Sequence, residues 1–332
     1  MATDPPVAYR GPVSSPVASP GTAPVPAARP AADPADVGRS GVAHGLTTAA
    51  CAATGIWLLW RLFVDTAGGQ RVDQAVFEGA AYGRTRLWQV AQPVLDLISV
   101  PFLALVLLGT VLIAIGRRRW GLAVQVALLV GGANLTTQVL KNIVFERPDL
   151  GATSAGYANT LPSGHTTVAA SVSAALVFVV PPRARPWAAV LGALYTAATG
   201  VSTLIGRWHR PSDVAAAVLV VLAWSGFACA LAAATRPRDG VGRPLLPGRG
   251  SGGRRARPGG FGVGGGLLLL AGSGAAVPAG YAMHRSWTTT GALDSRAELL
   301  LAYAGGALGV VAISAVAFAA LLLVCRATGR AA

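Results

Sequence analysis

Long, nearly uninterrupted apolar blocks constrain the fold of this chain more than any other feature of its sequence. A helix needs about 20 mostly apolar residues to cross a hydrocarbon layer of roughly 30 Å. Apolar residues make up 53% of the chain and charged residues only 12%, which is enough apolar sequence for several such helices. We expect spanning helices near residues 45–64, 95–116, 120–141, 165–182, 187–206, 213–235, 261–283 and 299–325. The sequence therefore predicts an all-α protein, a polytopic membrane helical bundle.

The net charge of +14 is carried by arginines that fall in alternate loops. They follow the second, fourth and sixth apolar blocks and close the chain. The positive-inside rule puts these loops and both termini in the cytoplasm of a cell-membrane protein. The loops at 65–94, 142–164, 207–212 and 284–298 then face outward. The alternative is that the basic loop at 236–259 binds lipid headgroups or nucleic acid. The orientation of the chain in the membrane alone explains the charge of this loop, so no nucleic-acid partner is expected.

Composition divides the chain into four parts. Residues 1–40 are rich in Pro and Ala and predict a disordered cytoplasmic tail. Residues 41–235 hold a six-helix core. Residues 236–259 form a basic Gly/Arg/Pro-rich cytoplasmic linker, and residues 260–332 form a membrane segment of two C-terminal transmembrane helices.

The two C-terminal helices carry glycines at four-residue spacing, which permits helices to approach closely. These pairs are Gly260/Gly264, Gly262/Gly266 and Gly305/Gly309. Neither helix has an internal ionisable residue, the usual sign of function inside a bilayer. We interpret the pair as a packing or dimerising appendage, through which the chain could form a homo-oligomer.

Polar residues share one face of the third predicted helix. Asn134, Gln138 and Lys141 are four and three residues apart. Lys141 is the only lysine of the chain, and a compact ammonium differs chemically from the guanidinium used everywhere else. The alternative is a lysine that extends from a helix end to the membrane interface.

Three further segments lie in the predicted outward loops or at helix ends. They are KNIVFERPDL with Arg147, PSGH at 162–165 and GRWHRPSD at 206–213. Ser163 is a good N-cap, and the N–H groups of a helix that begins at Gly164 would face an anion, which the missing Cβ lets approach. Pro211 suits the first turn of another helix with its N-terminus in the same region. With Lys141 and Arg147, these features predict a phosphate-binding site.

His209 and Asp213 supply an imidazole and a carboxylate four residues apart. The carboxylate can accept the Nδ1 proton and leave Nε2 free as a nucleophile. His165 is then available as an acid. Single histidines near helix ends are more often interfacial polar residues, and we assign His44 and His284 to that class.

These segments resemble the motifs of the type 2 phosphatidic acid phosphatase family, lipid phosphatases related in fold to vanadium haloperoxidases. The family pattern is a Lys followed by Arg-Pro, then Pro-Ser-Gly-His, then Ser-Arg with a His and an Asp further on. The resemblance covers about residues 135–220. Its most specific part is the complete Pro-Ser-Gly-His at 162–165.

The resemblance implies a role for each matching residue. His209 would be the nucleophile that forms a phosphohistidine, Asp213 would orient it, and His165 would protonate the departing alkoxide. The residues expected to hold phosphate oxygens are Lys141, Arg147, Ser163 and Gly164. The family requires no metal, and no cofactor is expected.

The sequence departs from the family pattern at two places. Only five residues separate Lys141 from Arg147, one fewer than usual. In the third motif, Thr203 stands where the family has a phosphate-binding Arg. Arg207 lies four residues further on the same helix face and is the predicted replacement, with Arg210 as a second candidate.

The sequence thus predicts an integral membrane lipid phosphatase that acts at the outer face of the membrane. Its substrate would be a phosphate monoester or diphosphate of a lipid or isoprenoid, hydrolysed through a phosphohistidine without a metal. The alternative, suggested by Thr203, is a catalytically silent phosphatase-like protein that binds or moves anionic lipids. A haloperoxidase is a more distant alternative, because the apolar helices favour a lipid substrate. The headgroup and chain length stay open.

Overall fold

The computed structural model describes residues 34–96, 108, 109, 112, 116, 120–151, 159–235 and 262–328. Within these residues the chain is helical and forms no strand, which confirms the predicted all-α fold. The α-helices are α1 (Pro34–Leu59), α2 (Ala67–Gly79), α3 (Arg84–Asp96), α5 (Trp120–Val139), α6 (Gly164–Val179), α7 (Arg185–Ile205), α8 (Pro211–Ala234), α9 (Gly262–Thr288) and α10 (Arg296–Ala327). Helices α1 and α5 each continue into a wider π-turn, Trp60–Val64 and Leu140–Val144.

Six of the described helical segments are long and apolar enough to cross a membrane, which makes this a multi-pass membrane protein. They are Arg39–Val64, Trp120–Val144, Arg185–Ile205, Pro211–Ala234, Gly262–Thr288 and Arg296–Ala327. The block predicted at 165–182 instead forms the 16-residue α6, shorter than a full span, because Pro181 and Pro182 follow it. The block predicted at 95–116 and the linker at 236–259 fall almost wholly outside the described residues, as does the tail up to residue 33.

The segment 65–94, predicted as a loop, contains helices α2 and α3. Thr66 caps α2, because its Oγ1 accepts a hydrogen bond from the backbone N–H of Gly69 at 3.1 Å. Val72 and Val76 lie four residues apart on α2, and both are buried. This short amphipathic helix proves important for the candidate site.

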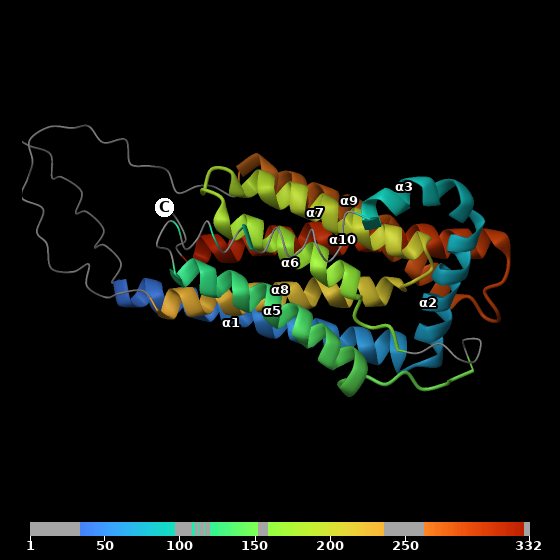
Figure 1. Ribbon diagram of the computed structural model, residues 1–332. Coiled ribbons are helices and arrows are strands. Elements are labelled where there is room, and N and C mark those ends of the chain that lie inside the picture. Colours follow the sequence, from blue (N-terminus) through green and yellow to red (C-terminus); the bar gives the residue numbers. More distant parts are fainter. Residues whose placement is uncertain are drawn as a thin grey trace, which may run out of the picture. The chain divides into compact units, whose positions relative to one another are not determined.

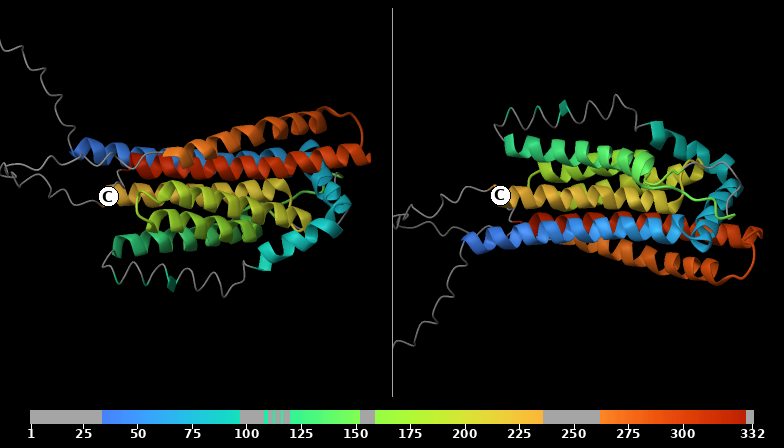
Figure 2. Two further views of the ribbon diagram at one scale, coloured as in Figure 1. Left: turned by 90° about the horizontal axis from the view of Figure 1, so that it is seen from above. Right: turned by 90° about the horizontal axis from the view of Figure 1, so that it is seen from below.

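Helix α8 is the hub of the bundle, and it packs against α1, α5, α6 and α10 (Figure 1). Its contact with α1 is especially close, because a Cβ added to Gly45 would lie 2.6 Å from the carbonyl oxygen of Gly226. Both views of Figure 2 show α10 between α9 and α8. The last helix is therefore surrounded by other helices of the chain.

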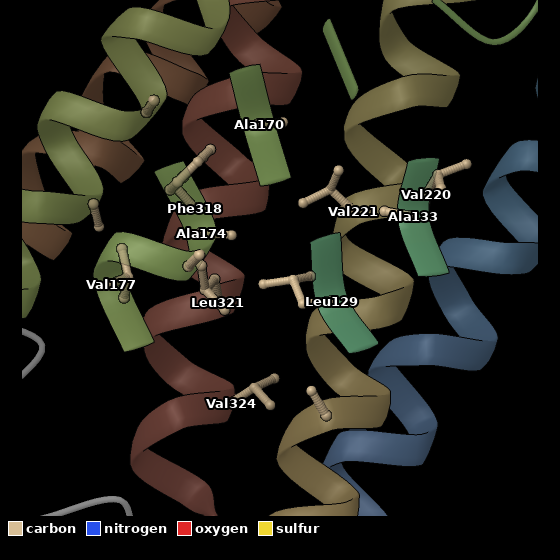
Figure 3. Packing of buried hydrophobic residues seen from close by; sticks show 14 of the residues in the cluster. Leu129, Ala133, Ala170, Ala174, Val177, Val220, Val221, Phe318, Leu321 and Val324 are labelled. Atoms are coloured by element: carbon tan, nitrogen blue, oxygen red, sulfur yellow. The ribbon is translucent and has the colours of Figure 1, made fainter. Parts of the chain in front are cut away.

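One apolar cluster includes residues of α5, α6, α8 and α10 (Figure 3). Its labelled members are Leu129 and Ala133 of α5, Ala170, Ala174 and Val177 of α6, Val220 and Val221 of α8, and Phe318, Leu321 and Val324 of α10. Lipid tails are as apolar as these side chains, so inside a bilayer the cluster stabilises the bundle mainly through van der Waals packing. The C-terminal helix thus packs into the same core as α5, α6 and α8.

The glycines predicted to allow close packing behave in two ways. A Cβ on Gly264 would lie 2.8 Å from Pro186 of α7, and a Cβ on Gly305 would lie 2.5 Å from Ala282 of α9. These two glycines therefore serve contacts within the chain. Gly266 and Gly309 border open space instead. A homo-oligomer through α9 and α10 stays a prediction.

Candidate active site

His209 and Asp213 form a tightly held pair at the start of α8. Asp213 Oδ2 lies 3.2 Å from His209 Nδ1 and also accepts hydrogen bonds from the backbone N–H of Arg210 at 2.9 Å and from Thr160 Oγ1 at 2.6 Å. Both side chains are buried, with 7% and 0% exposure. An ionised carboxylate accepts a hydrogen bond from Nδ1–H, and in that neutral tautomer Nε2 of His209 carries no proton. Thr160 is a partner that the sequence motifs did not indicate.

His165 lies opposite His209, in the first turn of α6. The centroids of the two rings are 6.2 Å apart and their planes are inclined at 66°. The N-termini of α6 and α8 are joined directly, because Ser163 N donates to Asp213 O at 2.9 Å. The ring of the exposed Trp208 also contacts His165, with 5.4 Å between the ring centroids. Two imidazoles distant in the sequence therefore face one small region.

Ser163 and Gly164 open α6. Ser163 is fully buried, and its hydroxyl oxygen accepts from the backbone N–H of Thr166 at 3.4 Å, as an N-cap does. A Cβ added to Gly164 would meet only the side-chain Nε2 of Gln138, at 4.0 Å. The space beside this helix N-terminus is therefore open, and a helix N-terminus attracts anions.

Arg147 is a buried cation without hydrogen-bond acceptors among the described residues. Its side chain is 3% exposed, and its nearest charge partner is Asp73, with 3.9 Å between Nη2 and Oδ2. None of its guanidinium nitrogens donates a hydrogen bond to the part of the chain that the structure describes. Burial lowers the pKa of Arg147, as does the nearby positive charge of Arg210, while Asp73 and Asp213 act in the opposite sense. Unsatisfied buried donors are costly, and an oxyanion would satisfy them.

Lys141 lies in the π-turn that ends α5 and is an electrostatic neighbour of His165. In this turn Phe145 N donates to Leu140 O at 2.9 Å, five residues back along the chain. The altered backbone occurs where the Lys141 to Arg147 spacing departs from the family pattern.

The two candidate replacements for the missing motif Arg both contact Phe77 of α2. Arg207 has a positive φ of 58°, its Nε donates to Phe77 O at 3.1 Å, and its guanidinium lies 4.6 Å from the ring centroid. The guanidinium of Arg210 lies 5.2 Å from the same centroid. Arg210 is 1% exposed, and its Nη2 donates to Gln74 Oε1 at 3.0 Å.

Arg210 belongs to a group of charged residues that also includes Arg147 and Asp73. It interacts electrostatically with both of them. Thr203 supplies no charge, and its buried hydroxyl donates to Gly200 O at 2.7 Å.

Helix α2 contributes residues that the sequence motifs missed. Asp73 is 2% exposed, and its Oδ2 accepts from Ser212 Oγ at 2.5 Å. Burial raises the pKa of Asp73 to about 6, helped by the negative charge of Asp213 and opposed by Ser212, Arg147 and Arg210. The available signal was an inward polar pattern at three- and four-residue spacing in a segment interpreted as a loop. Across the described residues, no three His, Cys, Asp or Glu side chains gather as a metal site.

A comparison with protein-family models matches residues 122–236 to the PAP2 superfamily. This segment is similar to that superfamily over about a third of the chain. The match confirms the resemblance to type 2 phosphatidic acid phosphatases and covers α5 to α8 with the loops between them. No curated protein and no solved structure matches the chain.

The match to the PAP2 superfamily suggests phosphatase activity on phosphate esters. The matched segment contains Lys141, Arg147, His165, His209 and Asp213. Helix α2, with the carboxylate nearest to Arg147, lies outside it.

Proposed function

We propose that this chain is an integral membrane lipid phosphatase that hydrolyses a phosphate monoester or diphosphate of a lipid or isoprenoid. The observation that carries the proposal is the guanidinium of Arg147. It lies within the PAP2 segment, is buried near Asp73 and the Asp213 that pairs with His209, and has no hydrogen-bond acceptor among the described residues. Phosphate oxygens are the acceptors that a buried guanidinium binds best.

The chemistry follows from the arrangement of the two imidazoles. Nε2 of His209 attacks phosphorus and forms a phosphohistidine, while the bond from phosphorus to the leaving oxygen breaks. His165 gives its proton to the departing alkoxide, and then takes a proton from the water that hydrolyses the phosphohistidine and releases inorganic phosphate. Asp213 stabilises the positive charge that develops on the His209 ring, through the contact of 3.2 Å.

The negative charge of the phosphoryl group is met by side chains and helix N-termini. Phosphoryl transfer depends mainly on positioning and on charge compensation at the equatorial oxygens. Lys141, Arg147 and the open N-terminus of α6 at Gly164 supply this compensation in the proposal, so no metal is needed. Of the two candidates for the missing motif Arg, we favour Arg210, because it belongs to the same charge cluster as Arg147.

A lipid substrate is supported by the position of the polar cluster. The cluster gathers residues from the ends of α5 and α7 and the starts of α6 and α8, and α5, α7 and α8 are long enough to span a membrane. A phosphorylated headgroup could enter the cluster while its apolar chains stay in the bilayer. We propose that this end faces the extracytoplasmic side and that both termini are cytoplasmic, as the arginine distribution indicates.

The test is trapping of the covalent intermediate. The purified full chain in detergent, with a chelator present, is incubated with radiolabelled phosphatidic acid or a polyprenyl diphosphate and quenched in alkali, which preserves phosphohistidine. We expect label on the wild type and on His165→Ala, but none on His209→Ala. Activity that disappears with the chelator, or that persists in His209→Ala, would refute the mechanism.

The second candidate function is a silent phosphatase-like protein that binds or moves anionic lipids. The specific observation in its favour is Thr203, whose uncharged hydroxyl is occupied by Gly200 O. This candidate predicts binding of the lipid phosphates without release of inorganic phosphate and without label on His209.

A further inference from the structure

One face of helix α2 carries four residues that lie on one side of the candidate site. They are Gln70, Asp73, Gln74 and Phe77, all buried, and their spacing gives them the same face of the helix. Three of the four are polar or charged. Buried polar groups need partners, so the contacts of this face indicate what the helix does.

The α2 face, which lies outside the PAP2 segment, contacts the loop that carries Arg147 and the guanidinium of Arg210. Nε2 of Gln70 donates to the carbonyl oxygen of Pro148 at 2.8 Å, which fixes the loop immediately after Arg147. Gln74 Oε1 accepts from Arg210 Nη2 at 3.0 Å. Helix α2 therefore contacts both segments that carry the buried arginines.

Asp73 connects these segments through its carboxylate. Its Oδ2 accepts from Ser212 Oγ and its Oδ1 from Ser212 N at 3.4 Å, so it caps the first turn of α8 from another helix. The same Oδ2 lies 3.9 Å from Arg147 Nη2. One side chain thus joins α2, the turn that follows His209 and the loop of Arg147.

A cap alone would not require a charge. A neutral Asn is as good an N-cap as Asp, whereas a buried carboxylate carries a large desolvation cost. Burial raises the pKa of Asp73 to about 6, and the charges of Arg147 and Arg210 oppose that rise. The charge of Asp73 therefore has its counterpart in the guanidinium groups.

We propose that Asp73 is a positioning residue of the phosphate site, which holds the guanidinium of Arg147 toward the substrate phosphate and fixes the first turn of α8. This inference rests on the proposed function. It assigns to α2, outside the matched segment, a part in substrate binding. Asp73 acts through Arg147 and does not itself touch the substrate.

The main test compares Asp73→Asn with Ser212→Ala in the full chain in detergent. Asp73→Asn keeps an acceptor for Ser212 but removes the charge that faces Arg147. Without the charge of Asp73, Arg147 should lose one charge-assisted hydrogen bond to the substrate phosphate. We therefore expect KM for phosphatidic acid to rise about tenfold, with kcat within about threefold. Ser212→Ala removes the hydroxyl partner and keeps the charge, and its KM should change much less. Equal changes of KM in both variants would show that Asp73 only caps the first turn of α8.

A pH series gives a readout that a structural role would not move. The groups that face Asp73 are Ser212, Asp213 and Arg210 of the α8 start and Arg147 of the loop. Asp73→Asn resembles the protonated wild type. The KM ratio of variant to wild type should therefore fall toward one as the pH is lowered from about 8 to about 5. A ratio that is independent of pH would overturn the inference.

A double-variant cycle with Arg147→Gln covers the case in which Asp73→Asn fails to fold. The double variant of Asp73→Asn and Arg147→Gln neutralises both members of the pair, and it should have the KM of Arg147→Gln alone. An additive effect would show that Asp73 does not act through Arg147.

Binding of inorganic phosphate, measured as a shift of the thermal midpoint, distinguishes a failure of this inference from a failure of the proposed function. A wild type without turnover that binds phosphate more tightly than Asp73→Asn would retain the inference and refute the phosphatase. An active wild type with an unchanged Asp73→Asn would do the reverse. A wild type that neither turns over nor binds phosphate would overturn both.

Discussion

Arg210 and Gln74 lie 136 residues apart in the chain, and Nη2 of the arginine donates to Oε1 of the glutamine at 3.0 Å. This bond anchors to α2 a cation that stands next to His209 in the sequence. Arg207 has a different acceptor on α2, because its Nε donates to the backbone carbonyl of Phe77.

The first prediction concerns these two arginines. Arg210→Ala should lower kcat/KM for a lipid phosphate by at least about tenfold more than Arg207→Ala, because removal of a charge from the buried cluster costs more than removal of one at its edge. Steady-state phosphate release from both variants measures this. A larger loss in Arg207→Ala would return the role to Arg207.

The second prediction concerns the open space at Gly164. Gly164→Ala should raise KM severalfold, because the new Cβ enters the space beside the N-terminus of α6, where the phosphate is proposed to bind. The thermal midpoint should not fall, because the nearest atom is the Gln138 amide at 4.0 Å and Ala favours a helix.

Two matched glycines on α5 serve as controls for Gly164→Ala. Gly131→Ala enters open space away from the site and should change neither KM nor stability. Gly132→Ala should lower the thermal midpoint, because its Cβ would lie 2.7 Å from the ring of Trp224. An unchanged KM in Gly164→Ala would mean that phosphate does not approach this glycine.

The third prediction is a pH dependence of stability due to Asp73. Its folded-state pKa of about 6 exceeds the ordinary value of 3.8, so the folded chain binds this proton more tightly than the unfolded chain. The contribution is fully present below pH 3.8 and is lost as the pH rises through about 6. The shift corresponds to about 3 kcal/mol.

Thermal melts in detergent can isolate this contribution. The midpoint of the wild type minus that of Asp73→Asn should decrease by several degrees as the pH rises from about 4 to about 7. A difference that stays constant across this range would contradict the raised pKa.

The fourth prediction tests the packing of α10 against α8. Cys229 Sγ and Cys325 Sγ lie 4.0 Å apart in the buried core. Mild oxidation with copper phenanthroline and oxygen should join them in a disulfide, with the two thiol protons and electrons passing to oxygen. A chain with a protease site inserted between 248 and 249 should then stay in one piece after cleavage, until reductant is added. Cys229→Ala is the control, and separation of the oxidised wild-type fragments would contradict the packing.

The residues of the candidate site could be found in the sequence because each motif is local. His209 and Asp213 are four residues apart, and the one-turn geometry of a helix start brings them together. Ser163 and Gly164 are likewise adjacent at a helix N-terminus. The spanning helices were readable for the same reason, since a bilayer requires long apolar blocks and most of these blocks form helices.

By itself, the sequence therefore determined the all-helical membrane fold and the proximity of His209 to Asp213 and of Ser163 to Gly164, because these follow from short-range spacing and apolar content. Only the tertiary structure decided which distant groups meet. Asp73 contacts Ser212, 139 residues further along the chain, and Arg147, 74 residues further, and α10 packs into the core formed with α5, α6 and α8. Such contacts depend on how helix faces pack against one another, and the order of residues within one helix does not specify its partner.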